Sequence, residues 1–96
     1  MRMMNTFRIQ YDETSNVANL QQHTGISLAD AEAVFYDEGA LRLHDHDHDQ
    51  QPWIIMGLDA TRRLLVAAYA HAGPGVVQVT GARIASSHEA RQYLEN

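Results

Sequence analysis

VVQVTGARIASSHEARQYL, residues 76–94, combines the signals of a strand and of a helix in one continuous segment. Its first half is an apolar run typical of a buried strand, interrupted by the small residue Gly81. Ser86 and Glu89 have the S-x-x-E spacing of a capping box, which marks the first turn of a helix. The segment therefore predicts a last strand over residues 76–84 and a closing helix from Ser86, with Arg83 near their junction.

Two further helices are expected in the first third of the chain. Asp12 is placed to cap a helix over about residues 13–23, with Val17 and Leu20 facing inward. Ser27 and Asp30 repeat the capping-box spacing at the start of a second helix. The apolar residues of this second helix fall on one face: Leu28, Ala31, Val34 and Phe35.

Five segments have the pattern of strands. Residues 7–12 alternate between apolar and polar side chains, as a half-buried strand does. The others are residues 41–44, 53–58, 64–70 and 76–84, with a Gly-Pro-Gly turn at residues 73–75. The order β-α-α-β-β-β-β-α predicts an α+β protein with an antiparallel sheet and helices packed on one of its faces. At 96 residues, we expect one domain over residues 1–96.

The composition limits the chemistry. The chain has no cysteine, which excludes disulfides, zinc-thiolate sites and cysteine nucleophiles. Seven arginines are its fixed cations, lysine is absent, and the net charge is −5. A site for phosphates must therefore use a few arginines and histidines, or be supplied by a partner. The sequence has no apolar run of membrane-spanning length and no signal-peptide pattern, so we expect a cytoplasmic protein without membrane contact.

Three blocks carry a resemblance to a known family. They are residues 11–27 (YDETSNVANLQQHTGIS), residues 54–70 (IIMGLDATRRLLVAAYA) and residues 79–86 (VTGARIAS). The first contains an aromatic–Asp pair, a spaced asparagine and a His/Gly step before a helix start, and the last contains an Ala–Arg strand end. Together they resemble the BrnT family of type II toxin–antitoxin toxins, which are small ribonucleases with a RelE-like fold.

The resemblance implies RNA cleavage without a metal or other cofactor. It also implies a BrnA-like antitoxin as partner, and assembly as a homodimer or as a toxin–antitoxin heterotetramer. Such cleavage needs a base, an acid and cations for the developing phosphate charge. Histidine and arginine suit these tasks because of the near-neutral pKa of imidazole and the planar fork of guanidinium. The candidate catalytic residues are Arg83, His23, His71 and Arg63.

Each candidate also has a simpler structural interpretation. Arg83 is equally placed to pair with a neighbouring acid, and Arg63 to be an exposed hairpin arginine. His23 at a helix end is favoured there by the helix dipole, and His71 follows a strand as a loop histidine would.

Two further residues are candidates for substrate binding. His88 lies in the first turn of the closing helix and Tyr69 at the end of a central strand, where an aromatic ring can stack on an RNA base. Trp53 has the same stacking ability. The alternatives are an exposed helix position for His88 and core packing for both aromatic residues.

The run HDHDHD, residues 44–49, is an alternation of histidine and aspartate. In an extended chain its histidines share one face, and two histidines at this spacing can chelate a transition metal. The weak metal candidates are therefore His44, His46 and His48. A solvated edge whose charges block sheet-to-sheet association explains the same pattern, so no metal is assigned.

Two functions other than catalysis follow from these observations. Residues 50–52 (QQP) stand where the family usually has acidic residues followed by an arginine, residues 70–72 (AHA) where it has another arginine, and Ile84 where it has a basic residue. These differences favour a binding module that keeps the fold and the antitoxin-facing surface but has weakened chemistry. The histidine–aspartate run favours, as a third hypothesis, a metal-binding protein.

Overall fold

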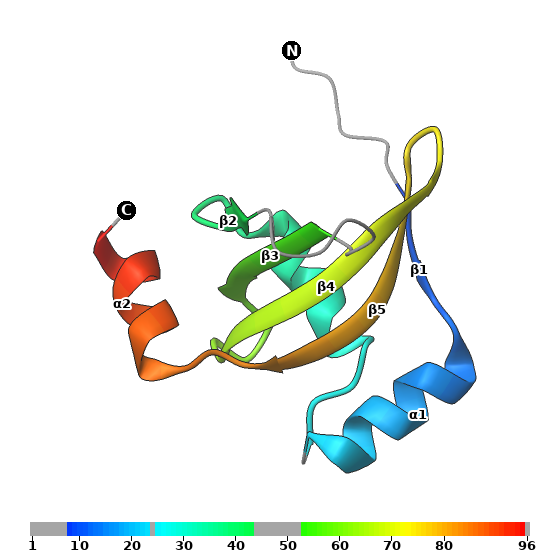
Figure 1. Ribbon diagram of the computed structural model, residues 1–96, viewed down its shortest axis with the longest axis horizontal. Helices are drawn as coiled ribbons and strands as arrows, with labels where there is room; N and C mark the ends of the chain where they lie inside the picture. The colour runs from blue at the N-terminus through cyan, green and yellow to red at the C-terminus, as the bar shows by residue number, and fades with distance from the viewer. Residues whose placement is uncertain (1–7, 24, 44–52, 96) are drawn as a thin grey trace.

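A five-stranded sheet with the order β1-β5-β4-β3-β2 is the scaffold of the protein (Figure 1). The computed structural model describes residues 8–23, 25–43 and 53–95. The elements are β1 (Arg8–Tyr11), α1 (Glu13–Gln22), the 3-10 helix η1 (Asp30–Tyr36), β2 (Leu41–Leu43), β3 (Trp53–Leu58), β4 (Leu64–Gly73), β5 (Val76–Ile84) and α2 (Ser87–Glu95). The predicted order of elements is confirmed.

The sheet is mixed, so the prediction of an antiparallel sheet is wrong for its first strand. Strands β2 to β5 form the expected antiparallel meander, but β1 pairs with β5 in parallel, with Ile9 opposite Val77. Alternation of apolar and polar residues fixes which face of a strand is buried, but not the direction of its neighbour. The short connections from β3 to β4 and from β4 to β5, by contrast, require antiparallel pairing.

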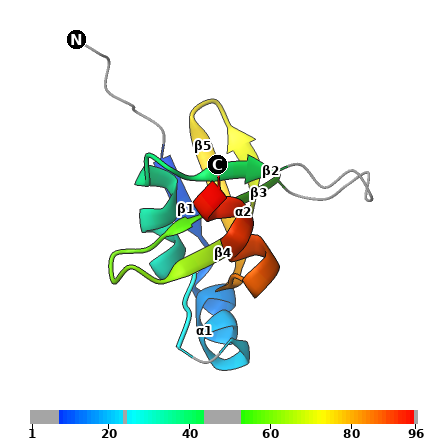
Figure 2. The ribbon, with the colours of Figure 1, turned by 90° about the vertical axis from the view of Figure 1, so that its left-hand side faces the viewer.

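Helix η1 covers one face of the sheet, opposite β3 and β4 (Figure 2). Its capping box is present: the Ser27 N–H donates to Asp30 Oδ2 at 3.0 Å, and the Asp30 N–H donates to Ser27 Oγ at 3.1 Å. The four apolar residues predicted to share a face are all buried: Leu28, Ala31, Val34 and Phe35. The segment forms a 3-10 helix of 7 residues, which is longer than the runs of about 3–4 residues usual for this helix type.

Helices α1 and α2 contribute little to the apolar core, unlike the predicted packing of all helices on one face. Val17 and Leu20 in α1 remain 45% and 43% exposed, so their predicted inward orientation is wrong. The buried residue of α1 is Asn19, and α2 has no buried residue. α2 is held by polar contacts, among them a 2.6 Å hydrogen bond from the Tyr93 hydroxyl to Asp37 Oδ2. No helix in the described part of the chain is long and apolar enough to cross a membrane.

A β-bulge in β5 decides the orientation of Arg83. Ala68 lies opposite Gly81, but Tyr69 lies opposite Val79, so Thr80 is an extra residue on β5. The inward-facing residues therefore change from Val77 and Val79 before the bulge to Ala82 after it. Without the bulge, the alternation of a strand would have turned the side chain of residue 83 toward the core. With it, Arg83 faces outward.

Candidate functional site

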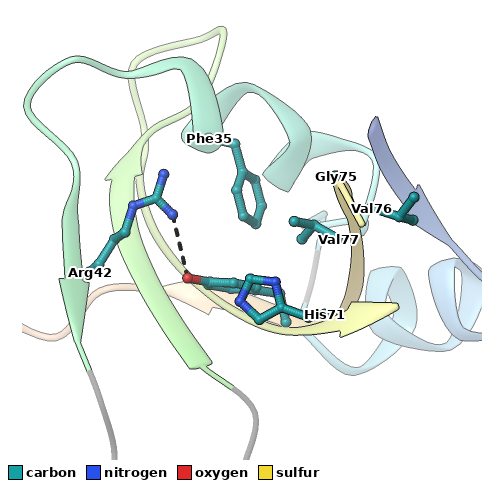
Figure 3. Close-up of a pocket in the computed structure, with 7 residues that line it drawn as sticks. Phe35, Arg42, His71, Gly75, Val76 and Val77 are labelled. Atoms are coloured by element: carbon teal, nitrogen blue, oxygen red, sulfur yellow. Dashed lines mark hydrogen bonds between the residues drawn. The ribbon is translucent and has the colours of Figure 1, made fainter. Parts of the chain in front are cut away.

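An open pocket of about 230 Å³ lies between η1, β2 and the adjoining ends of β4 and β5 (Figure 3). Its wall combines apolar groups with one guanidinium, one phenol and one imidazole. The lining residues are Phe35, Arg42, Tyr69, His71, Gly75, Val76 and Val77. Tyr69 and His71 share a face because they are two residues apart on β4.

Arg42 and Tyr69 meet across this pocket. Arg42 Nη1 donates to the Tyr69 hydroxyl oxygen at 3.4 Å, the contact drawn in Figure 3. That distance is long for a hydrogen bond, and the partner carries no charge. Within the described residues no carboxylate forms an ion pair with Arg42. Its positive charge is therefore not neutralised by that part of the chain, and the pocket has an arginine able to meet an anion.

A row of aromatic rings runs from the core, past the pocket, to the surface. The ring centroids of Phe35 and Tyr69 are 5.1 Å apart, and those of Tyr69 and His71 are 5.9 Å apart. Trp53 continues the row, with its centroid 5.9 Å from that of His71. All three contacts are edge-to-face, the arrangement that the ring quadrupoles favour. The row therefore holds the His71 imidazole between two rings.

His23 and Arg83 lie together on a different surface. Both line shallow, open depressions beside α1 and β5, and Gln22 lines the same depressions. Ala68 lines one of these depressions and Tyr69 lines the pocket of Figure 3, and successive strand residues point to opposite faces. The sequence-predicted residues are thus divided between the two faces of β4.

The guanidinium of Arg83 is bound to Glu89 at the start of α2. Its Nη1 and Nη2 atoms donate to the two carboxylate oxygens of Glu89, each at 2.8 Å. Glu89 also accepts from the Ser86 N–H at 2.8 Å, so the predicted capping box forms. The hydrogen bonds from Arg83 lower the pKa of Glu89 from 4.5 to about 2, and Glu89 in turn raises the pKa of Arg83. The observed pair agrees with the simpler interpretation of Arg83, in which its guanidinium pairs with a neighbouring acid.

Arg63 is engaged by two acids and a carbonyl. Its Nε and Nη2 atoms lie 2.8 Å from Asp59 Oδ2, Nη2 lies 3.1 Å from Asp30, and Nη1 donates to the Gly25 carbonyl at 3.2 Å. Burial would raise the pKa of Asp59, but hydrogen bonds from Arg63 and Thr61 lower it below its ordinary value. Arg63 therefore joins the β3–β4 hairpin to the loop before η1.

The remaining candidates lie apart from these groups. His88 is exposed in the first turn of α2. His44, His46 and His48 lie outside the described residues. In the described ranges, no cluster of three or more histidine, cysteine, aspartate or glutamate residues could hold a metal ion.

Sequence reasoning missed Arg42 as a site residue. The sequence did show that Arg42 is the polar residue between two leucines of a short predicted strand. It could not be selected, however, because the pairing of β2 with β3 and the position of η1 bring it to Tyr69.

An α+β protein with an arginine, a phenol and an imidazole around one pocket has groups suited to phosphate-ester chemistry. The profile of the family described as the ribonuclease toxin BrnT of type II toxin–antitoxin systems matches residues 11–89. The chain therefore belongs to the BrnT toxin family.

The fold agrees with a solved structure of that name. The chain is similar to the 1.1 Å crystal structure of the Brucella abortus ribonuclease toxin BrnT, with a TM-score of 0.66 and 20% sequence identity. The similarity covers 85% of this chain and 100% of that chain. No curated protein matches the sequence.

Proposed function

We propose that this protein is a ribonuclease toxin of a type II toxin–antitoxin system that cleaves RNA without a metal in the pocket of Figure 3. The observation that carries the proposal is the convergence of Arg42, Tyr69 and His71 on one pocket of a BrnT-family fold. These side chains supply a positive charge, a hydroxyl group and an imidazole within the wall of a single cavity.

The chemistry is an internal transfer of the phosphate ester. The ribose 2′-oxygen attacks the adjacent phosphorus, the bond to the 5′-oxygen of the next nucleotide breaks, and a 2′,3′-cyclic phosphate forms. Neutral His71 accepts the 2′-hydroxyl proton, and the Tyr69 hydroxyl, held by Arg42, donates a proton to the leaving oxygen. Arg42 stabilises the charge that develops on the phosphate oxygens.

His23 and Arg83 form the second candidate for this chemistry, on the other face of β4. The bidentate contact with Glu89 places a carboxylate where a phosphate would have to bind, so this surface is the weaker candidate. A catalytic contribution from Arg83, His23 or Arg63, and substrate contacts by His88, stay predictions.

The partner and the location are proposed from the family to which the chain belongs. A cognate antitoxin, BrnA-like in the simplest case, would bind the toxin and prevent access to RNA in the cytoplasm. The assembly would be a homodimer or a toxin–antitoxin heterotetramer, and sedimentation of the co-expressed pair would distinguish the two.

A binding module with weakened catalysis is the second candidate function. Arg63 and Arg83, the two arginines predicted to be catalytic, are both bound to carboxylates, and the chain carries a net charge of −5. A chain of this kind would still bind the antitoxin but would not arrest growth when produced alone.

RNA cleavage in the presence of EDTA tests the proposal. The wild-type protein should cleave RNA and leave cyclic-phosphate ends, and His71→Ala should reduce the rate by about 100-fold, the usual scale of general acid–base catalysis. His23→Ala is the matched control, because it removes an exposed histidine from the other face. Absence of cleavage by the wild type would contradict the enzymatic function. Equal effects of the two substitutions would contradict the choice of pocket.

A further inference from the structure

We propose that the aromatic row is a nucleobase-binding surface, and that Trp53 at its exposed end stacks on an unpaired base of single-stranded RNA. This inference rests on the proposed function, because the base belongs to the RNA that the neighbouring pocket cleaves. It specifies that the RNA substrate is single-stranded and that Trp53 is the residue that selects single-stranded RNA.

Within the described residues, the row runs from two buried rings to two accessible ones. Phe35 and Tyr69 are buried, at 6% and 2% exposure, and they fix the inner rings in the core beneath η1. His71 is exposed, and Trp53 leaves 41% of its surface accessible. The row therefore presents an indole ring to solvent from a rigid base, which is how stacking platforms for single strands are built.

Trp53 is positioned by the sheet. It is the first residue of β3 and lies directly opposite Tyr69 of β4, so both side chains stand on the same face. The edge contact with His71 leaves the two rings at 78° to each other, and does not stack them face to face. Because Trp53 contacts His71, which lines the pocket with Arg42, a base on the Trp53 ring would belong to a nucleotide close to the phosphate that Arg42 would bind.

The charge of the chain favours a single strand over a duplex. A protein binds duplex RNA mainly through contacts to phosphates and 2′-hydroxyls, since the bases are already stacked and paired. This chain has net charge −5 and no lysine, and the guanidinium groups of Arg63 and Arg83 already pair with acids. Affinity must then come from contacts that need few cations, and stacking is such a contact.

Fluorescence provides a direct test, because Trp53 is the one tryptophan in the sequence. A short single-stranded 2′-O-methyl RNA, which cannot be cleaved by 2′-oxygen attack, should quench the emission of the wild-type protein. The same sequence closed into a duplex should leave it nearly unchanged. Equal quenching by both forms, or no quenching by the single strand, would overturn the inference.

Variants measure how much the stacking contributes. Trp53→Leu should weaken binding of the labelled single strand by about tenfold or more, and Trp53→Phe should recover most of the loss. Tyr36→Leu, which removes another exposed aromatic ring, should leave binding unchanged. Wild-type affinity in Trp53→Leu would overturn the inference.

Two features of the design keep the result clear. The wild-type titration needs no substitution, so it decides the question even if Trp53→Leu fails to fold. Quenching without any RNA cleavage would support the base-stacking surface and contradict the ribonuclease function. Cleavage without quenching would support the ribonuclease function and contradict the base-stacking surface.

Discussion

Arg42 and Arg83 lie near opposite faces of the same sheet and differ in their partners. Arg42 donates to the uncharged Tyr69 hydroxyl at 3.4 Å, whereas Arg83 donates to both oxygens of the Glu89 carboxylate at 2.8 Å. A bidentate carboxylate contact satisfies the guanidinium fork in charge and in geometry. A phosphate would have to displace Glu89 from Arg83, whereas among the described residues the contact that it would displace from Arg42 is the long one to the Tyr69 hydroxyl.

The position of an arginine at a strand end therefore does not establish its role. Arg83 has the family-matched position, and its charge is used to attach α2 to the sheet. Arg42 lies on the short edge strand β2, and its charge is directed into a pocket with an imidazole. The partner of each arginine in the folded protein therefore distinguishes a structural cation from a functional one.

The largest effect should come from replacing the two arginines in parallel. Arg42→Ala should reduce RNA cleavage by about 100-fold or more, because it removes the donor that stabilises the phosphate charge. Arg83→Ala should keep cleavage within about threefold of the wild type, because an exposed ion pair contributes little. Initial rates on one RNA substrate measure both.

Arg42→Lys refines this test. It keeps the positive charge but loses the planar fork, so its rate should fall between those of the wild type and Arg42→Ala. If Arg83→Ala lost more activity than Arg42→Ala, the roles assigned to the two arginines would be contradicted.

Substitution of Asn19 tests whether the face of the sheet that carries Arg83 has a structural role. Its Nδ2 donates to the Ile26 and Ala82 carbonyls at 2.8 and 2.9 Å, and its Oδ1 accepts from the Ala82 N–H at 3.1 Å. Asn19→Ala leaves buried backbone groups of Ala82 without partners, so the free energy of unfolding should fall by about 2–3 kcal/mol. Urea denaturation measures this loss.

Asn16→Ala is the control on the same helix. Asn16 accepts one exposed hydrogen bond, from the Ala29 N–H at 3.0 Å, so its loss should cost about 1 kcal/mol or less. Below the unfolding transition, Asn19→Ala should retain cleavage. Loss of cleavage by folded Asn19→Ala would instead place the active site on the α1 side of the sheet.

The smallest expected effect is the contribution of the Arg83–Glu89 ion pair to the stability of the fold, which depends on pH. The pKa of Glu89 is about 2 in the folded protein against an ordinary value of 4.5, so the ionised carboxylate stabilises the fold above pH 4.5. This contribution is lost as the pH falls from 4.5 through about 2. Because the Arg83 side chain is 45% exposed, solvent screens the pair, and Glu89→Gln should cost about 1 kcal/mol at pH 7.

Thermal or urea unfolding of the wild type and Glu89→Gln across this pH range checks the expectation. The difference between them should be constant from pH 7 to about 5 and should shrink toward zero near pH 2. Glu95→Gln, at the exposed end of α2, should show no comparable pH-dependent difference. A gap between wild type and Glu89→Gln that widened on acidification would contradict the assignment.

Much of the fold could be predicted because its signals are local. The Asp12 cap and the Ser27–Asp30 and Ser86–Glu89 capping boxes are contacts over three residues, and all three form. Most strand limits followed from apolar runs. The predicted end of β4 at residue 70 is wrong, because the strand continues to Gly73, and His71 therefore lies in a strand and not in a loop. The other errors concern contacts between distant segments, namely the parallel pairing of β1 with β5 and the exposure of Val17 and Leu20.

The candidate site was predicted less completely. Tyr69 and His71 were candidates from the sequence, and the structure places them in one pocket. Arg42 was missed because its approach to Tyr69 joins residues 27 positions apart. The pairing of Arg83 with an acid was one of two interpretations open from the sequence, and the start of α2 provides that acid.

The order of the elements, their caps and the family could be inferred from the sequence alone, because short-range hydrogen bonds and the periodicity of apolar residues depend on neighbouring positions. The tertiary structure decided which charges are available. The bulge at Thr80 turns Arg83 outward, and the position of α2 then brings Glu89 to it. The pairing of β2 with β3 leaves Arg42 beside a neutral phenol. Whether an arginine is neutralised depends on the group that folding brings within about 3 Å of it, and no local pattern specifies that group.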